Sequence, residues 1–196
     1  MTDTIAPLRE FVRSMTQLLA QERNEAAVLR NGRAHLARLI ADDGWLPSKF
    51  SAPRPDRYAQ YLLHADALEQ FSVVSFVWQP GQRTPVHDHT VWGLVGVLRG
   101  AERCEEYRLM DGLPRPTGHS HLMKAGDIDA VSPTIGDWHR VSHGAASGIA
   151  VSIHVYGGNI GALTRHCLDG TSRPADFVSG YDLDEVPNLW NSPCKA

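Results

Sequence analysis

The chain has 196 residues, of which 42% are hydrophobic and 21% charged, with a formal net charge of −3. This balance is typical of one compact globular domain and lacks the basic excess that a nucleic-acid partner requires. Three cysteines are too few for a disulfide scaffold, and no apolar run approaches the roughly 20 residues that cross a bilayer, so we expect a cytoplasmic protein that does not enter membranes.

Two amphipathic helices are expected first. Apolar residues recur every three or four positions from Pro7 to about Glu22, and a proline suits the first turn of a helix. A second helix is expected to begin near Asn24, a good N-cap residue, and to end within "ADDGWLP", which supplies a glycine and a proline.

After residue 51 the pattern changes to short β-rich runs separated by Gly, Pro and Asp, as in an all-β sandwich or barrel. The runs span residues 58–65, 70–78, 92–100, 101–110, 127–133, 139–144 and 148–157. From Gly157 we expect loops, a short helical turn near residues 160–168 and a tail around the barrel. The single domain thus comprises a helical segment, residues 1–50, and a barrel with a C-terminal extension, residues 51–196.

Histidines are the first candidate functional residues. In "TPVHDHTVWG", His87 and His89 lie about 7 Å apart along an extended backbone and on the same face, so both could bind one ion. By itself this spacing also describes a solvated pair. His139, which follows a proline and glycine turn, is a possible third ligand at the mouth of the barrel.

At this point two motifs carry a resemblance to a known family. "GQRTPVHDHTVWGLVGVLRG" resembles the first cupin motif, and "GDIDAVSPTIGDWHRVSH" resembles the second. The resemblance implies a double-stranded β-helix barrel, or jelly roll, with a metal inside. Gly93 stands where many cupins have a glutamate ligand, and His143 stands where the second motif usually ends in Asn.

The missing glutamate leaves a three-histidine site, and together with "AVSIHVYGGN" this is similar to the cysteine dioxygenase and 3-mercaptopropionate dioxygenase family. The resemblance implies one Fe(II) per chain, held by His87, His89 and His139. Ligand type alone does not name the metal, since three histidines also hold zinc. We expect no cysteine–tyrosine cross-link, because Gly93 occupies the place of the cysteine, and we expect Cys104 to be a buried spectator.

Ser152, His154 and Tyr156 alternate with valine and isoleucine, so they share one face of a strand. Either that face is solvated and the aliphatic face is buried, or the polar face points inward. The resemblance implies the second arrangement, with a relay of the three side chains toward the iron and Tyr156 hydrogen bonding to oxygen or substrate.

The resemblance also implies how a substrate carboxylate is held. Gln60 stands where animal-type cysteine dioxygenases have an arginine, and Arg165 stands nine residues after Tyr156, as in bacterial 3-mercaptopropionate dioxygenases. A guanidinium binds a carboxylate with two hydrogen bonds, although an exposed arginine at a helix end would be equally ordinary.

The sequence therefore predicts an Fe(II) thiol dioxygenase that uses O2 and a small carboxylated thiol, 3-mercaptopropionate or L-cysteine, and forms a sulfinic acid. We expect a monomer or a weak homo-oligomer. Two other functions fit the same barrel: a metal-binding sensor or storage module without turnover, and a metal-dependent isomerase or hydrolase. His143 is expected either behind a ligand or facing solvent.

Overall fold

The fold begins with two antiparallel helices, seen in a computed structural model that describes residues 5–168 and 173–190. Helix α1 (Ala6–Gln21) has a proline in its first turn. Helix α2 (Glu25–Leu39) is capped by Asn24, whose side chain accepts a hydrogen bond of 3.0 Å from the backbone N–H of Ala27. Both predicted helices are present, although α2 ends at Leu39, before the stretch 41–47 in which its end was expected. A short 3-10 helix, η1 (Ser48–Ser51), leads to the barrel.

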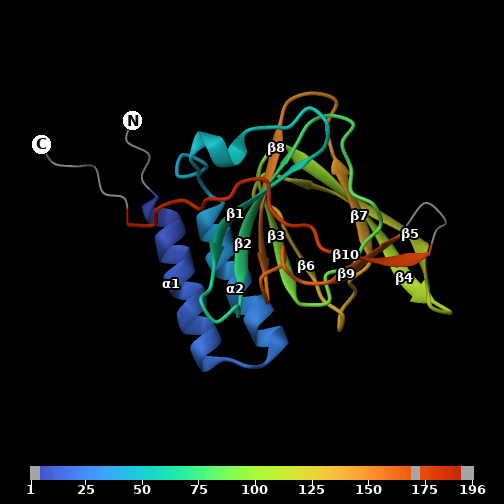
Figure 1. Cartoon of the computed structure of the whole chain (residues 1–196), viewed down its shortest axis with the longest axis horizontal. Helices are drawn as coiled ribbons and strands as arrows, with labels where there is room; N and C mark the ends of the chain where they lie inside the picture. The colour runs from blue at the N-terminus through green and yellow to red at the C-terminus, as the bar shows by residue number, and fades with distance from the viewer. Residues whose placement is uncertain (1–4, 169–172, 191–196) are drawn as a thin grey trace, which may run out of the picture.

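Two antiparallel sheets form the barrel (Figure 1). The five-stranded sheet has the order β1-β2-β8-β3-β6, and its strands are β1 (Ala59–Ala65), β2 (Ser72–Trp78), β8 (Ala150–Tyr156), β3 (Gly93–Arg99) and β6 (Ile128–Val131). The three-stranded sheet has the order β5-β4-β7, and its strands are β5 (Leu113–Lys124), β4 (Ala101–Met110) and β7 (His139–His143). A hairpin of β9 (Arg165–Leu168) and β10 (Pro174–Phe177) completes the fold.

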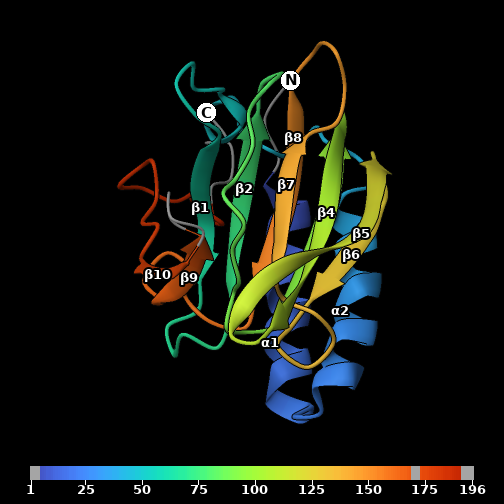
Figure 2. The ribbon, with the colours of Figure 1, turned by 90° about the vertical axis from the view of Figure 1, so that its right-hand side faces the viewer.

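The helices cover the outer face of the five-stranded sheet, and the three-stranded sheet faces its inner side (Figures 1 and 2). Helix α2 packs on β3 at close range: a Cβ at Gly96 would lie 3.0 Å from Ile40 and 3.1 Å from Leu36. Because strand side chains alternate, one face of each central strand joins the helix-side core and the other lines the barrel.

Strand β8 lies at the centre of the large sheet and is buried on both faces. Its aliphatic side chains, Val151, Ile153 and Val155, belong to the core that the two helices close. The alternating polar side chains of β8 are therefore turned into the barrel, and the alternative in which they face water is wrong.

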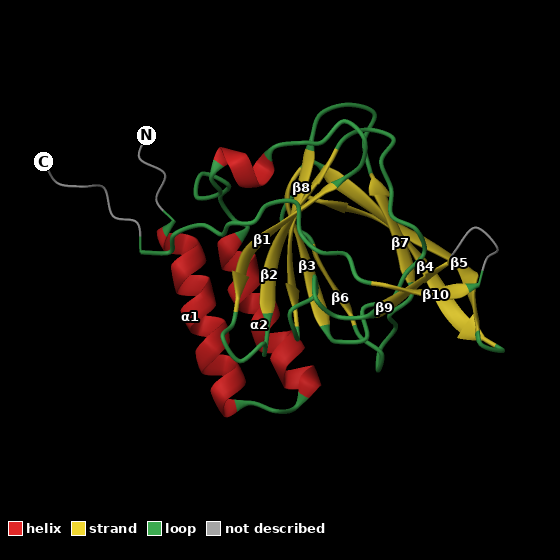
Figure 3. Ribbon diagram, in the orientation of Figure 1, coloured by secondary structure: helices red, strands yellow, loops and turns green. Residues whose placement is uncertain are grey.

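Strand β5 does not appear among the predicted runs. It contains Pro114, Pro116 and Gly118, residues that weaken a strand signal. Among the described strands, β5 pairs only with β4 and lies at the edge of its sheet, where proline is tolerated (Figure 3). An edge position depends on the tertiary fold, so the local sequence does not show it.

The prediction of a helical turn followed by loops holds only for its first part. Leu163 N–H donates to the carbonyl of Asn159 at 3.2 Å, which makes a single turn, and the chain then forms β9 rather than a longer loop. Part of the predicted tail, residues 169–172 and 191–196, lies outside the described residues.

The architecture agrees with the prediction of an all-β barrel with an N-terminal helical segment. Among the described residues, no helix is both long enough and apolar enough to span a membrane.

Candidate metal centre

Three histidines converge inside the barrel. His87 and His89 come from the segment that leads into β3, and His139 begins β7. Their ligand atoms lie within 4.8 Å of one another, their ring centroids are 4.8 to 4.9 Å apart, and each side chain is buried. Backbone hydrogen bonds of 3.0 Å in both directions between His87 and His139 fix the approach of the two segments.

Each of the three rings has a partner at Nδ1. The Nδ1–H of His87 donates to the carbonyl of Pro85 at 3.0 Å, and that of His89 donates to Asp137 Oδ1 at 2.8 Å. The Nδ1 of His139 lies 3.5 Å from the sulfur of Cys104. Occupied Nδ1 atoms leave the Nε2 atoms as the free ligands of a common ion, which is the arrangement that orients histidine ligands in metal sites.

Burial keeps these imidazoles neutral. It lowers the pKa of His87 to about 4, and it lowers the pKa of His89 and of His139 well below 6.5, with the neighbouring histidines adding to the effect. Neutral imidazole is the form that binds a metal, so the cluster is ready to hold a cation at pH 7 without losing protons first.

Three side chains of β8 form a hydrogen-bonded relay toward the histidines. Ser152 Oγ lies 2.8 Å from His154 Nε2, and His154 Nδ1 lies 2.7 Å from the hydroxyl of Tyr156. All three are buried, and the ring of Tyr156 stacks on His89 with centroids 5.3 Å apart. Burial lowers the pKa of His154 to about 3 and raises that of Tyr156, so both are neutral near pH 7.

Gly93 leaves the space that the Tyr156 ring occupies. The two residues are paired across β3 and β8, and a Cβ at Gly93 would lie 2.9 Å from a ring carbon of Tyr156 and 2.9 Å from Val131. A larger side chain at this position would displace the tyrosine, so the position of the Tyr156 ring requires a glycine at residue 93.

Arg165 and Gln60 lie on the same side of the histidines. Arg165, the first residue of β9, is 5% exposed, and its Nη2 donates to Ser179 Oγ at 2.7 Å. Gln60 Nε2 donates to the same hydroxyl at 3.0 Å and to the carbonyl of Gly180 at 2.9 Å. The guanidinium lies over the ring of Phe177, 4.5 Å from its centroid. The alternative prediction, in which Arg165 is exposed at the end of a helix, is therefore wrong.

The Nε of Arg165 has no hydrogen-bond partner within the described part of the chain, and burial lowers the pKa of the guanidinium. An arginine nevertheless remains charged in proteins, so this is a buried cation with an unused donor. It shares a cavity of about 30 Å³ with His87 and Tyr156. Such a volume holds one or two water molecules, so a larger ligand requires lining side chains to shift.

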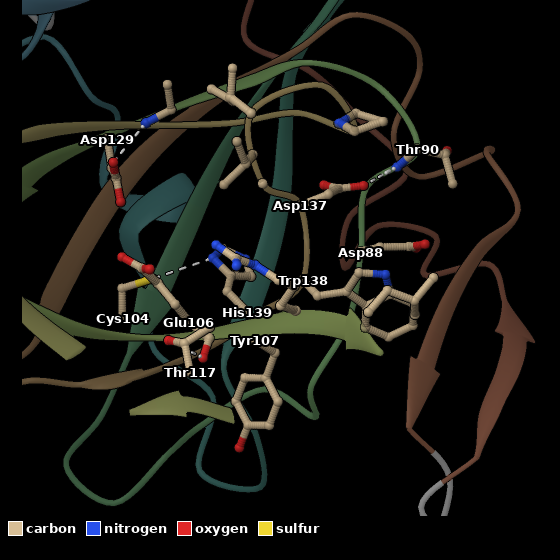
Figure 4. Close-up of a pocket in the computed structure, with 17 residues that line it drawn as sticks. Asp88, Thr90, Cys104, Glu106, Tyr107, Thr117, Asp129, Asp137, Trp138 and His139 are labelled. Carbon is tan, nitrogen blue, oxygen red and sulfur yellow. Dashed lines mark hydrogen bonds between the residues drawn. The ribbon is translucent and has the colours of Figure 1, made fainter. Parts of the chain in front are cut away.

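A larger pocket of about 660 Å³ lies on another side of His139 (Figure 4). Cys104 faces the ring of His139 there, and four carboxylates contribute to the lining: Asp88, Glu106, Asp129 and Asp137. Because the Nδ1 of His139 points to Cys104, its Nε2 is turned away from this sulfur and toward the smaller cavity. The chemistry of the histidines is therefore directed to the 30 Å³ cavity.

Cys104 is buried as expected, and burial with nearby carboxylates raises the pKa of its thiol to about 12. Its contact with His139 was not expected. His143 turns to the loop that follows it, where its Nδ1 lies 2.8 Å from the carbonyl of Ala145, so it is not behind a ligand.

Sequence reasoning missed Asp137 and Ser179. Asp137 accepts hydrogen bonds of 3.0 Å from the backbone N–H groups of His89 and Thr90 as well as from the His89 ring. Its place two residues before His139 is the only local signal for it. Ser179 has no local signal, since its partners lie 119 and 14 residues away.

No family model matches the chain. Among solved structures, the barrel is similar to an uncharacterized conserved protein with a double-stranded β-helix domain from Klebsiella pneumoniae: 20% identity over 58% of this chain and 89% of that one, TM-score 0.47. It is also similar to an RmlC-like cupin protein from Ralstonia eutropha: 16% identity over 63% of this chain and 68% of that one, TM-score 0.45.

A third similar structure is oxalate oxidase in complex with the substrate analogue glycolate, at 19% identity and a TM-score of 0.47. The match covers 62% of this chain and 63% of the oxidase, so this chain spans less than two thirds of that protein's length. Similarities of this size concern the barrel alone. Fold and site together define an all-β barrel with a buried three-histidine cluster that can hold a metal ion.

Proposed function

We propose that this protein is an Fe(II)-dependent thiol dioxygenase, which adds both atoms of O2 to the sulfur of a small carboxylated thiol and so forms a sulfinic acid. The observation that carries the proposal is Arg165. This buried guanidinium has an unused donor and shares a narrow cavity with His87 and Tyr156. A cation that lines the same cavity as two of the three histidines suits an anionic group at the far end of a short substrate.

The donor set fits the proposed metal. Three neutral imidazoles leave a divalent ion with its full positive charge, so an anionic ligand is favoured at the remaining positions. A substrate thiol, with an ordinary pKa of about 8.5, loses its proton on coordination and supplies that negative charge. When bound, Fe(II) would supply the activation of O2 and the binding of the thiolate.

The other residues would orient the substrate and place its protons. Arg165 would donate two hydrogen bonds to the carboxylate, using the free Nε and an Nη. The hydroxyl of Ser179, which also accepts a hydrogen bond from Gln60, would keep the guanidinium in place. Tyr156 would donate its hydroxyl hydrogen bond to oxygen that is being transferred to sulfur. Because Gln60 is a neutral amide, a thiol without an amino group, such as 3-mercaptopropionate, should be preferred to L-cysteine.

Anaerobic reconstitution with Fe(II), followed by O2 uptake and product analysis with 3-mercaptopropionate and with L-cysteine, tests the proposal. We expect one sulfinate per O2 consumed. If iron binds at one per chain and neither thiol yields a sulfinate, the proposal is wrong. Stabilisation by the thiols without O2 consumption would instead indicate a sensor, and a zinc- or manganese-loaded protein indifferent to Tyr156→Phe would indicate an isomerase or hydrolase.

A further inference from the structure

Glu102 is an acidic residue inside the barrel that the proposed reaction does not use. It is the second residue of β4, its side chain is 1% exposed, and neither carboxyl oxygen has a hydrogen-bond partner among the residues that the structure describes. An ionised carboxylate in this position would be strongly disfavoured, because a buried charge without a partner loses its hydration and gains nothing in return. The carboxyl group is therefore expected to carry a proton or to interact with a polar neighbour.

The polar neighbours of Glu102 belong to the relay. Strand β4 packs against β8. The hydroxyl of Ser152 and the indole N–H of Trp78 lower the pKa of the Glu102 carboxyl against the effect of burial, as polar groups beside it do. The Trp78 Nε1 itself donates to Ser152 Oγ at 3.5 Å. These neighbours place Glu102 at the Ser152 end of the relay.

Ser152, His154 and Tyr156 do not by themselves determine which atom donates and which accepts in each hydrogen bond of the relay. A neutral imidazole has one donor nitrogen and one acceptor nitrogen, so the hydrogen bonds through His154 run one way or the other. In one direction, Ser152 donates to Nε2, Nδ1–H donates to the oxygen of Tyr156, and the tyrosine hydroxyl is free to donate into the cavity. In the reverse direction, Tyr156 donates to Nδ1, and the hydroxyl proton of Ser152 must find an acceptor elsewhere.

A carboxyl group beside Ser152 decides between these directions. A protonated Glu102 donates to Ser152 Oγ and leaves the serine proton for His154. An ionised Glu102 accepts the serine proton and reverses every hydrogen bond as far as Tyr156. We propose that Glu102 is a positioning residue that, in its protonated form, donates to Ser152 and so holds the Tyr156 hydroxyl as a donor toward the cavity. This inference rests on the proposed function, in which Tyr156 acts as that donor.

Other titratable groups face the same region. Cys104, Asp129 and His139 line a small cavity with Glu102, and His143 is its partner across β4 and β7. His143 has its own contacts with the carbonyls of Ala145 and Gly148, so it does not supply the missing partner. Burial raises the pKa of Glu102 to about 7, with Ser152 and Trp78 partly opposing the shift, so both protonation states are accessible near neutral pH.

The test compares Glu102→Gln with Glu106→Gln, a control on the same strand outside the relay. The glutamine amide donates to Ser152 at every pH but has no proton to lose. We expect wild type and the control to lose activity above neutral pH, whereas Glu102→Gln keeps the activity of the wild type at pH 6 and lacks this descending limb. An unchanged limb in Glu102→Gln, with activity intact, would overturn the role of Glu102 and leave the dioxygenase proposal standing.

A second measurement does not need turnover. In the metal-free protein, infrared difference spectra between low and high pH should show the C=O stretch of one buried protonated carboxylic acid that disappears near neutral pH. The band should be absent in Glu102→Gln, and Ser152→Ala should shift it in frequency. A carboxylate that stays ionised across the range, or a band indifferent to Ser152→Ala, would contradict the proposal even if Glu102→Gln fails to fold or the wild type oxidises no thiol.

Discussion

At the scale of single residues, the three histidines are held by three different partners: a backbone carbonyl, a carboxylate and a sulfur. Of the three partners, the carboxylate of Asp137 makes the most contacts, because it also accepts hydrogen bonds from the backbone N–H groups of His89 and Thr90. It therefore fixes both the ring and the peptide that carries the ring. Burial raises the pKa of Asp137, while the backbone hydrogen bonds of His89 and Thr90 oppose that rise.

We expect Asp137→Ala to weaken metal binding about 10- to 100-fold, which is the usual effect of removing a residue that orients a ligand histidine. Competition with a chelator of known affinity measures this change. Asp127→Ala is the matched control, because Asp127 accepts a backbone N–H, that of Lys124, at the turn between β5 and β6. Equal effects of the two changes would show that Asp137 acts only on the general stability of the barrel.

Arg165 is the residue that should discriminate among thiols. We expect Arg165→Ala to raise the KM for 3-mercaptopropionate by at least tenfold, because the loss of a charge-assisted pair of hydrogen bonds exceeds about 1.4 kcal/mol. The KM for 2-aminoethanethiol, which has no carboxylate, should change much less. Arg165→Lys should recover only part of the loss, because an ammonium does not form the paired contact. Steady-state kinetics with both thiols measures the difference, and an equal rise for the two would remove Arg165 from carboxylate binding.

At the scale of elements, the position of the site depends on how helix α2 rests on strand β3. The helix approaches so closely that Gly96 has no space for a side chain, and β3 then leads back to the segment of His87 and His89. Strand β9 fixes the other side: Asp88 N–H donates to the carbonyl of His166 at 3.0 Å, and Leu168 N–H donates to that of Val86 at 2.8 Å. These bonds bring Arg165 next to His87.

Gly96→Val should lower the free energy of unfolding by about 1–3 kcal/mol, the usual range for overpacking a close contact, since its Cβ meets Leu36 and Ile40 at 3.0 to 3.1 Å. Urea denaturation of the metal-free protein measures the loss. Ser120→Val, at an exposed position of the edge strand β5, is the control and should leave stability nearly unchanged. A Gly96→Val protein as stable as the control would mean that α2 moves away from β3 without penalty.

Local patterns were sufficient for part of this molecule. The helix periodicity, the cap at Asn24, most strands and the histidine pair are encoded in neighbouring residues, which is why they could be predicted. Edge strand β5, whose two prolines hide it, and the hairpin of β9 and β10 depend on the assembled fold. The same holds for Ser179 and Glu102, because their positions result from contacts between strands distant in the sequence.

At the scale of the whole molecule, the buried Glu102 makes stability depend on pH. Its pKa rises from 4.5 to about 7 on folding, so the unfolded chain releases this proton first as the pH increases. Below pH 4.5 both states are protonated and there is no penalty. Between pH 4.5 and 7 the folded state loses stability with rising pH, and above pH 7 the full penalty of about 3 kcal/mol applies.

Glu102→Gln removes this ionisation, so its free energy of unfolding relative to wild type should increase by about 3 kcal/mol between pH 4.5 and 8. Urea denaturation of the metal-free proteins at several pH values provides the measurement. Glu106→Gln, on the same strand but half-exposed, should show no such pH-dependent gain. A constant difference between Glu102→Gln and wild type across this range would show that Glu102 is ionised in the folded protein at acidic pH.

The hydroxyl of Ser179 accepts hydrogen bonds from both Gln60 and Arg165, and this sharing links two positions that could otherwise change independently in evolution. An arginine at position 60 would bring a second guanidinium to one small acceptor, so we expect Gln60→Arg alone to disturb Arg165 instead of adding a second anion contact. A double-mutant cycle between Gln60→Arg and Ser179→Ala, read as KM for each thiol, should be strongly non-additive, whereas additive effects would separate the two positions. Substrate preference in this barrel would then change by paired substitutions, with Ser179 as the residue that makes them interdependent.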